Sequence, residues 1–128
     1  MKIDVSIGEV VDKITILEIK EQKIKEQKKL SYVKKELNLL KDLLLNEGVT
    51  VPEDLADELR SINKKLWDTE DIIRELEIKG DFGKQFVEHA RLDAKLNDKR
   101  FLIKNKINNF CNSQVKEQKS YEGLYTAD

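Results

Sequence analysis

The sequence predicts an all-α protein: an elongated bundle of three to four long helices in antiparallel hairpins, with coiled-coil-like packing. Two observations predict this class. Apolar residues recur every three or four positions over long segments, as on the buried face of an amphipathic helix. Charged residues make up 38% of the 128 positions, which suits helices that expose their other faces to water. The length corresponds to one domain.

The first helix is expected at residues 6–27. Ser6 and Glu9 have the spacing of a capping box, in which each side chain accepts from a free amide of the first turn. The main apolar series is Ile7, Val10, Ile14, Leu17 and Ile24. Further apolar residues at Val11, Ile16 and Ile19 widen this face, so the helix is expected to contact more than one neighbour.

The second helix is expected at residues 29–47. Its apolar series is Leu30, Val33, Leu37, Leu40 and Leu44. This series is out of phase with the first one, which predicts a break or kink near residues 27–29. Because no glycine or proline lies there, one bent helix is the alternative. Gly48 can adopt the left-handed conformation that ends a helix.

The third and fourth helices are expected at residues 52–79 and 82–111. Pro52 suits a first helical turn, Gly80 suits a helix end, and Asp81 is positioned to cap the fourth helix. The linker is so short that the two helices must form an antiparallel hairpin. In that hairpin, residues whose numbers sum to about 162 lie opposite each other.

The apolar pattern ends after the fourth helix. Residues 1–111 are therefore expected to form a single helical domain, and residues 112–128 an irregular C-terminal tail. Tyr121 and Tyr125 are the tail side chains expected to dock on the body of the protein.

Polar residues interrupt the apolar faces of the third and fourth helices. Asn63, Glu70 and Arg74 lie on one stripe, and Asp93, Asn97, Arg100, Lys104 and Asn108 on another. The plain interpretation is a set of ionic rungs that fixes the register of the hairpin. The functional alternative is a small-ligand site, for which the candidate residues are Asp12, Lys13, Glu70, Arg74, Asn97, Asp98 and Arg100.

No catalytic residue, metal-ligand set or cofactor is predicted, so an enzyme is the less favoured interpretation. The pairs Glu18/Glu21 and Asp68/Asp71 match only weakly the carboxylate pairs with which helical nucleotide pyrophosphohydrolases bind magnesium. His89 is the only histidine, and no nucleophile is expected beside it.

Charge and hydropathy limit the partners and the location. The formal net charge is −1, so nucleic acid is not an expected partner, although lysines crowd residues 20–35. No apolar run reaches the roughly 18 residues that span a membrane, and no signal peptide is recognisable. The single cysteine cannot form an intrachain disulfide. A cytoplasmic protein is expected.

Several short motifs carry a resemblance to a known family. The most specific is residues 12–18, with the sequence DKITILE; others are Leu66-Trp67, Glu70-Asp71, Asn97-Asp98-Lys99-Arg100 and Lys119-Ser120-Tyr121. The chain resembles a small, uncharacterised helical family of bacteria and bacterial viruses. This resemblance implies a bacterial cell or a phage-infected host cell, and it implies no activity.

These observations favour a non-enzymatic interaction or scaffold protein that self-associates. Few residues of an elongated helical bundle lie far from solvent, so a second copy or another protein partner is expected to cover apolar surface. The alternative is a protein that binds a small anionic ligand, a nucleotide or a sugar phosphate, or a metal-dependent enzyme like the pyrophosphohydrolases. Either the ligand-binding protein or the enzyme would use the polar residues of the third and fourth helices.

Overall fold

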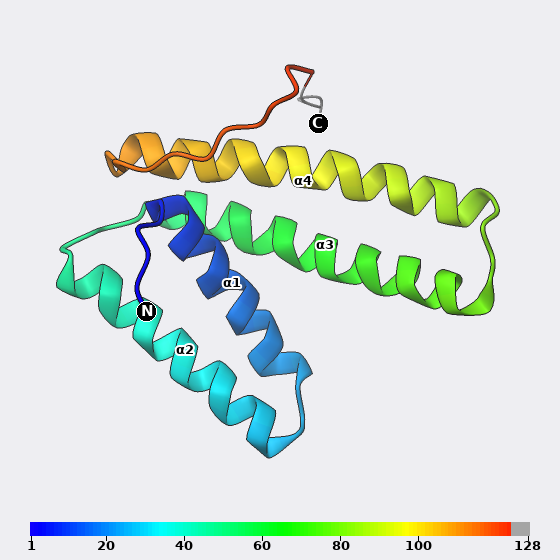
Figure 1. Cartoon of the computed structure of the whole chain (residues 1–128), viewed down its shortest axis with the longest axis horizontal. Helices are drawn as coiled ribbons and strands as arrows, with labels where there is room; N and C mark the ends of the chain where they lie inside the picture. The colour runs from blue at the N-terminus through cyan, green and yellow to red at the C-terminus, as the bar shows by residue number, and fades with distance from the viewer. Residues whose placement is uncertain (124–128) are drawn as a thin grey trace.

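The computed structural model describes residues 1–123 and contains four helices in that range (Figure 1). They are α1 (Ile7–Lys23), α2 (Gln27–Asn46), α3 (Glu53–Lys79) and α4 (Lys84–Phe110). No strand occurs in residues 1–123, so the predicted all-α class is confirmed. The expected docking of Tyr125 lies outside the described residues.

The helices form two hairpins that share α1 as their point of contact. The long helices α3 and α4 run antiparallel, and α1 packs across both of them. In contrast, α2 packs against α1 and against no other helix. Figure 1 shows the α1–α2 hairpin diverging from the α3–α4 hairpin, whose outer half extends beyond it. The α1–α2 hairpin is therefore joined to the α3–α4 hairpin through α1.

Two apolar clusters lie on different faces of α1. One cluster joins α1 to α2 and contains Val10, Ile14, Leu17, Val33 and Leu37. The other joins α1 to α3 and α4 and contains Val11, Leu59, Ile103 and Ile107. Leu59 and Ile107 are completely buried, and each such side chain contributes about 1.5–3 kcal/mol to stability. The expectation that the first helix contacts several neighbours is confirmed.

The break between the first two helices lies slightly earlier than predicted. α1 ends at Lys23, and Ile24 has an extended backbone with φ −83° and ψ 128°. The Ile24 side chain still packs on the α1–α2 cluster, so the chain turns without losing this apolar contact. The alternative of one bent helix is wrong.

Local capping explains three of the helix ends. The Ser6 hydroxyl accepts from the amide of Glu9 at 3.1 Å, which is one half of the predicted capping box, whereas the Glu9 carboxylate accepts from Lys104. Gly48 and Gly80 both have positive φ angles, of 66° and 70°. The expected cap at Asp81 is wrong, because its carboxylate accepts from the Gly83 amide within the turn and α4 begins only at Lys84.

Candidate functional site

A polar network is buried where α1 crosses α3 and α4. Its centre is Asp12, whose side chain is fully buried. Arg100 of α4 binds both carboxylate oxygens of Asp12, with Nε 2.8 Å from Oδ1 and Nη2 in contact with Oδ2. Asn63 of α3 donates to the same Oδ1 at 2.8 Å. One carboxylate of α1 thus fixes the position of two other helices.

The remaining polar groups around Asp12 are also paired. The Asn63 amide lies 2.7 Å from the hydroxyl of Thr15, which donates to the Asp12 carbonyl at 2.8 Å. The hydrogen bond to Asp12 raises the pKa of Arg100, although burial opposes this, and the nearby carboxylates of Asp12, Glu9 and Glu117 raise it further. Paired buried charges of this kind specify one arrangement of the helices.

A second part of the network surrounds Lys104, one helical turn beyond Arg100. This lysine is only 5% exposed. Its ammonium lies 2.7 Å from Glu9 and 3.0 Å from Glu117 of the C-terminal tail. Burial alone would lower the pKa of Lys104, but the hydrogen bond to Glu9 and the nearby carboxylates of Glu117 and Asp12 more than offset this, so the pKa is raised. Lys104 therefore joins the N-terminal helix to the tail.

The third part of the network holds the start of α1. The Gly8 amide donates to Asn108 Oδ1 at 2.6 Å, and the Ile7 amide donates to the Ser113 hydroxyl at 3.0 Å. First-turn amides have no partner within their own helix, and here α4 and the tail supply the acceptors. A Cβ at Gly8 would lie 2.6 Å from the Lys104 carbonyl oxygen, so only glycine allows this approach.

A separate acidic pair bridges α3 and α4 further along the hairpin. Glu70 and Asp93 line the same cavity between the two helices, and Asn97 donates to the Asp93 carbonyl at 3.0 Å and to its carboxylate at 3.3 Å. The pKa of Glu70 is raised, first by burial and then by the hydrogen bond and charge of Asp93, while Arg100 and Arg74 partly oppose the change. Asp93 Oδ1 is buried and has no hydrogen-bond partner.

This pair makes the stability of the protein depend on pH. Because the pKa of Glu70 is higher in the folded state than in the unfolded chain, its contribution is present at low pH and is lost as pH rises through the folded value. Glu70→Gln should therefore gain stability relative to the parent as pH rises above the ordinary glutamate value of about 4. Unfolding curves at several pH values measure the difference. Parallel profiles for the two proteins would contradict the expectation, and Glu75→Gln on the exposed face of α3 is the control.

The structure brings together only part of the predicted candidate set. Asp12 and Arg100 are in direct contact, while Glu70 and Asn97 are linked through Asp93, with Arg74 lining the same cavity as Glu70. Lys13 instead extends toward Glu36 of α2, at 3.8 Å, with its side chain half exposed. Asp98 accepts a hydrogen bond from Tyr121 of the tail at 3.3 Å. The seven candidates therefore do not converge on one point.

The predicted candidate set lacks five buried members of the network: Thr15, Asn63, Lys104, Asn108 and Ser113. Lys104 and Asn108 lie on the same sequence stripe as Arg100, which was the available signal. Thr15 lies in the DKITILE motif but has no distinctive spacing. Glu117, a further tail partner, follows an irregular segment in which no periodicity could identify it.

One carboxylate of each pair considered as metal ligands is engaged in an ion pair. Glu18 binds Arg60 at 3.1 Å, and Asp68 lies 3.5 Å from Lys64. Over the range 1–123, no three or more His, Cys, Asp or Glu side chains are grouped so that they could hold a metal ion.

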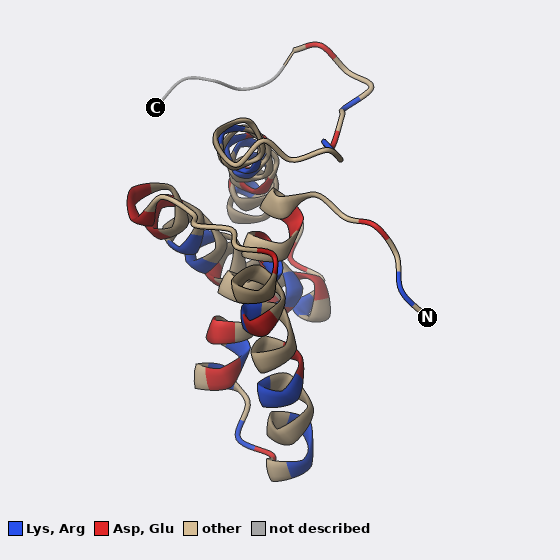
Figure 2. Cartoon of the chain, turned by 90° about the vertical axis from the view of Figure 1, so that its left-hand side faces the viewer, with Lys and Arg blue, Asp and Glu red and all other residues tan. Residues whose placement is uncertain are grey.

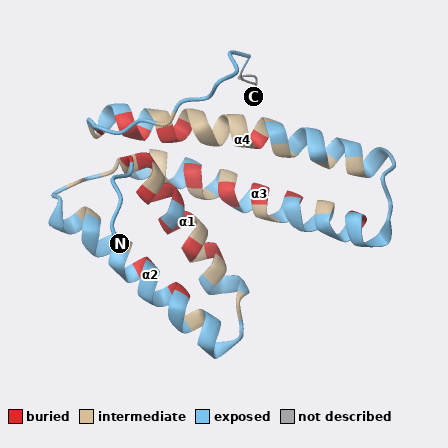
Figure 3. Ribbon diagram, in the orientation of Figure 1, coloured by how far each residue is buried: buried red, intermediate tan, exposed pale blue. Residues whose placement is uncertain are grey.

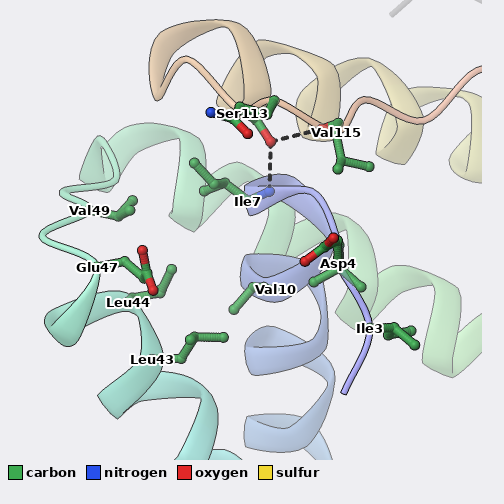
Figure 4. Close-up of a pocket in the computed structure, with 12 residues that line it drawn as sticks. Ile3, Asp4, Ile7, Val10, Leu43, Leu44, Glu47, Val49, Ser113 and Val115 are labelled. Atoms are coloured by element: carbon green, nitrogen blue, oxygen red, sulfur yellow. Dashed lines mark hydrogen bonds between the residues drawn. The ribbon is translucent and has the colours of Figure 1, made fainter. Parts of the chain in front are cut away.

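Several cavities adjoin this framework. A mainly apolar one, of about 420 Å³, lies between the start of α1, the end of α2 and the tail (Figure 4). A polar one, of about 230 Å³, is lined by Glu9, Asn97, Arg100, Phe101, Lys104, Glu117 and Lys119. Another, of about 260 Å³, lies on the other side of Arg100 and includes Asp12 and Lys13. Arg100 thus separates two polar cavities.

Comparison with known proteins gives one relationship. The family model described as "Family of unknown function (DUF6165)" matches residues 1–127. The chain belongs to this family. The DUF6165 match includes all four helices and the tail segment that carries Ser113 and Glu117. No curated protein and no solved structure matches the chain.

The DUF6165 domain also agrees with the predicted resemblance to an uncharacterised helical family. None of its helices within residues 1–123 is long and apolar enough to cross a membrane. Lys and Arg side chains are interspersed with Asp and Glu over the helices, in keeping with the net charge of −1 (Figure 2).

Proposed function

We propose that this protein is a non-enzymatic helical interaction or scaffold protein that self-associates through the outer half of its long hairpin. We define the distal hairpin as residues 70–94, the end of α3, the turn and the start of α4. The observation that carries the proposal is its lack of a core: Leu76 is the only buried residue among these 25 (Figure 3). As part of the same proposal, we place the protein in the cytoplasm of a bacterium or of a phage-infected cell.

The distal hairpin exposes large apolar side chains that a monomer leaves in water. They are Ile72, Ile78, Phe82, Val87 and Leu92. Ile78 is 81% exposed, and Phe82 is 57% exposed although its ring packs edge-on against Phe86. Figure 1 shows that α1 and α2 lie away from this part of the hairpin. Apolar surface of this kind commonly marks an interface.

The charge distribution favours a second copy of this chain as the occupant. Residues 70–79 contain four acidic and two basic residues, a net charge of −2. Residues 84–94 contain two basic and two acidic residues, a net charge of 0. If α3 of one copy packs beside α4 of the other about a two-fold axis, each acidic end of α3 lies beside a neutral segment with two cations, and the two acidic segments are kept apart. The product would be a four-helix bundle, a common way to bury two such hairpins.

The double variant Ile78→Ser/Val87→Ser tests this proposal. It should weaken self-association by at least about tenfold, because both side chains lose apolar area that the interface buries. Sedimentation velocity over a range of concentrations measures the dissociation constant. The matched control is Leu45→Ser at the end of α2, which removes a side chain that is 76% exposed outside the distal hairpin.

Two results would overturn the proposal. One is a parent protein that stays monomeric up to about 1 mM, where the free energy of association would be weaker than about 4 kcal/mol. The other is a distal-hairpin variant that associates as tightly as the parent while the Leu45 variant does not.

A further inference from the structure

The C-terminal tail turns back and lies antiparallel on α4. Asn112, with φ 55°, makes the reversal, and Ser113 is buried against the start of α1. Beyond it, successive tail residues contact successively earlier residues of α4. Glu117 contacts Lys104, Lys119 lies over the ring of Phe101, and Tyr121 binds Asp98. The tail thereby covers one side of the polar network.

Glu117 is the tail residue that enters the polar cavity of about 230 Å³. One carboxylate oxygen lies 3.0 Å from the ammonium of Lys104, and the other lies 3.3 Å from that of Lys119. The oxygen facing Lys104 is buried, and it lies at ion-pair distance but outside good hydrogen-bond geometry. The positive charge of Lys104 therefore attracts the Glu117 carboxylate, but this carboxylate oxygen makes no well-formed hydrogen bond.

The charges around the cavity are unbalanced without Glu117. The lining then contains three cations, Arg100, Lys104 and Lys119, and one carboxylate, Glu9. Asp12 neutralises Arg100 from behind, and Glu9 neutralises Lys104 in part. Asn97 also lines the cavity, but its amide already donates to Asp93. The three cations are the kind of groups that bind an oxyanion.

We propose that this cavity is a binding site for a small phosphate-type oxyanion, and that Glu117 is an internal occupant which the ligand displaces. The size of the cavity sets the ligand class, because its volume is below the roughly 300 Å³ at which pockets for drug-sized ligands begin. The site therefore accepts a single phosphate group, either free or at the end of a small molecule. Displacement leaves the ion pair between Lys104 and Glu9 in place, so ligand binding does not require the fold to open.

The electrostatics of Glu117 agree with this role. Burial alone would raise the pKa of its carboxyl group, but the hydrogen bonds and positive charges of Lys104 and Lys119 lower it. The position thus selects a negative charge over a neutral group. A dianionic phosphate carries more charge than the carboxylate it replaces and can accept from Lys104 and Lys119 at the same time.

Titration calorimetry of the full chain with inorganic phosphate, at constant ionic strength, tests the proposal. Glu117→Gln should bind phosphate about tenfold more tightly than the parent, because the variant loses its internal competitor, worth about one charge-assisted hydrogen bond. Lys119→Ala should bind more weakly than the parent. Lys116→Ala is the matched control, because Lys116 is a tail lysine that binds Asn109 away from the cavity and should leave the affinity unchanged.

A second arm separates free phosphate from a phosphate carried by a larger molecule. Glucose 6-phosphate binding at least as tightly as inorganic phosphate would assign the site to the terminal group of a sugar phosphate, and tighter binding of inorganic phosphate would assign it to the free ion. The proposal is overturned if neither the parent nor Glu117→Gln binds either probe at about 10 mM. It is also overturned if Lys119→Ala and Lys116→Ala weaken binding equally, because that result would indicate general charge attraction.

Discussion

Asp12→Ala should destabilise the protein by about 3–5 kcal/mol, the usual cost of removing one partner from a buried ion pair. The variant leaves the Arg100 guanidinium without its carboxylate and removes the acceptor of Asn63, so two other helices lose their common contact. Total stabilities of small domains are only about 5–15 kcal/mol, so much of the margin would disappear. Denaturant unfolding followed by circular dichroism measures the loss.

Two comparisons distinguish the ion pair from a general effect of losing a carboxylate. Asp68→Ala removes an exposed partner of Lys64 and should cost less than about 0.5 kcal/mol. The double variant Asp12→Ala/Arg100→Met should be less destabilised than the sum of the single variants, because it leaves no unpaired buried charge. A loss below about 1 kcal/mol for Asp12→Ala would show that the network contributes little.

Gly8→Ala should destabilise the protein by about 3 kcal/mol, the upper range for adding a methyl group where no space exists. The new Cβ would lie 2.6 Å from the Lys104 carbonyl oxygen, which belongs to the backbone of α4 and cannot rotate away. The shift that relieves this overlap would also stretch the hydrogen bond from the Gly8 amide to Asn108. Thermal or denaturant unfolding of the purified variant measures the effect.

The direction of this result is informative because alanine normally favours a helix over glycine by about 1 kcal/mol. An increase in stability for Gly8→Ala would mean that α1 and α4 are further apart than in the structure. Gly83→Ala is the control, because a Cβ there meets only the side chain of Asp81, at 3.3 Å, which can move. It should change stability by less than about 1 kcal/mol.

The helices and their register could be predicted because both depend on local pattern. Apolar spacing placed four helices, and the glycines at 48 and 80 marked two of the ends through their positive φ angles. The short turn set the alignment of α3 and α4: Asn63 and Arg100, whose numbers sum to 163, close to the expected value of about 162, bind the same Asp12 oxygen. The break after α1 was placed too late because Ile24 continues the apolar pattern with an extended backbone.

Which residues meet in the polar network could be predicted only in part, because it depends on how the helices pack in three dimensions and not on local spacing in the sequence. Asp12 was among the candidates because it belongs to the DKITILE motif, on which the family resemblance rests. Its neighbour Lys13 was grouped with it, but adjacent helical residues point about 100° apart, so Lys13 faces α2. Glu117 could not be found at all, because only the reversal at Asn112 brings it back to Lys104.

The contacts that hold α1 in place join residues from opposite ends of the chain. Asp12 and Arg100 are 88 positions apart, Glu9 and Lys104 are 95 apart, and Ile7 and Ser113 are 106 apart. Such separations are unusual for a helical protein, in which most contacts are local and folding is fast. During synthesis, the Asp12 carboxylate has no partner on α4 until nearly the whole domain has left the ribosome. α1 therefore reaches its final environment only after α4 has been made, and we expect closure of this long loop to slow the folding of the domain.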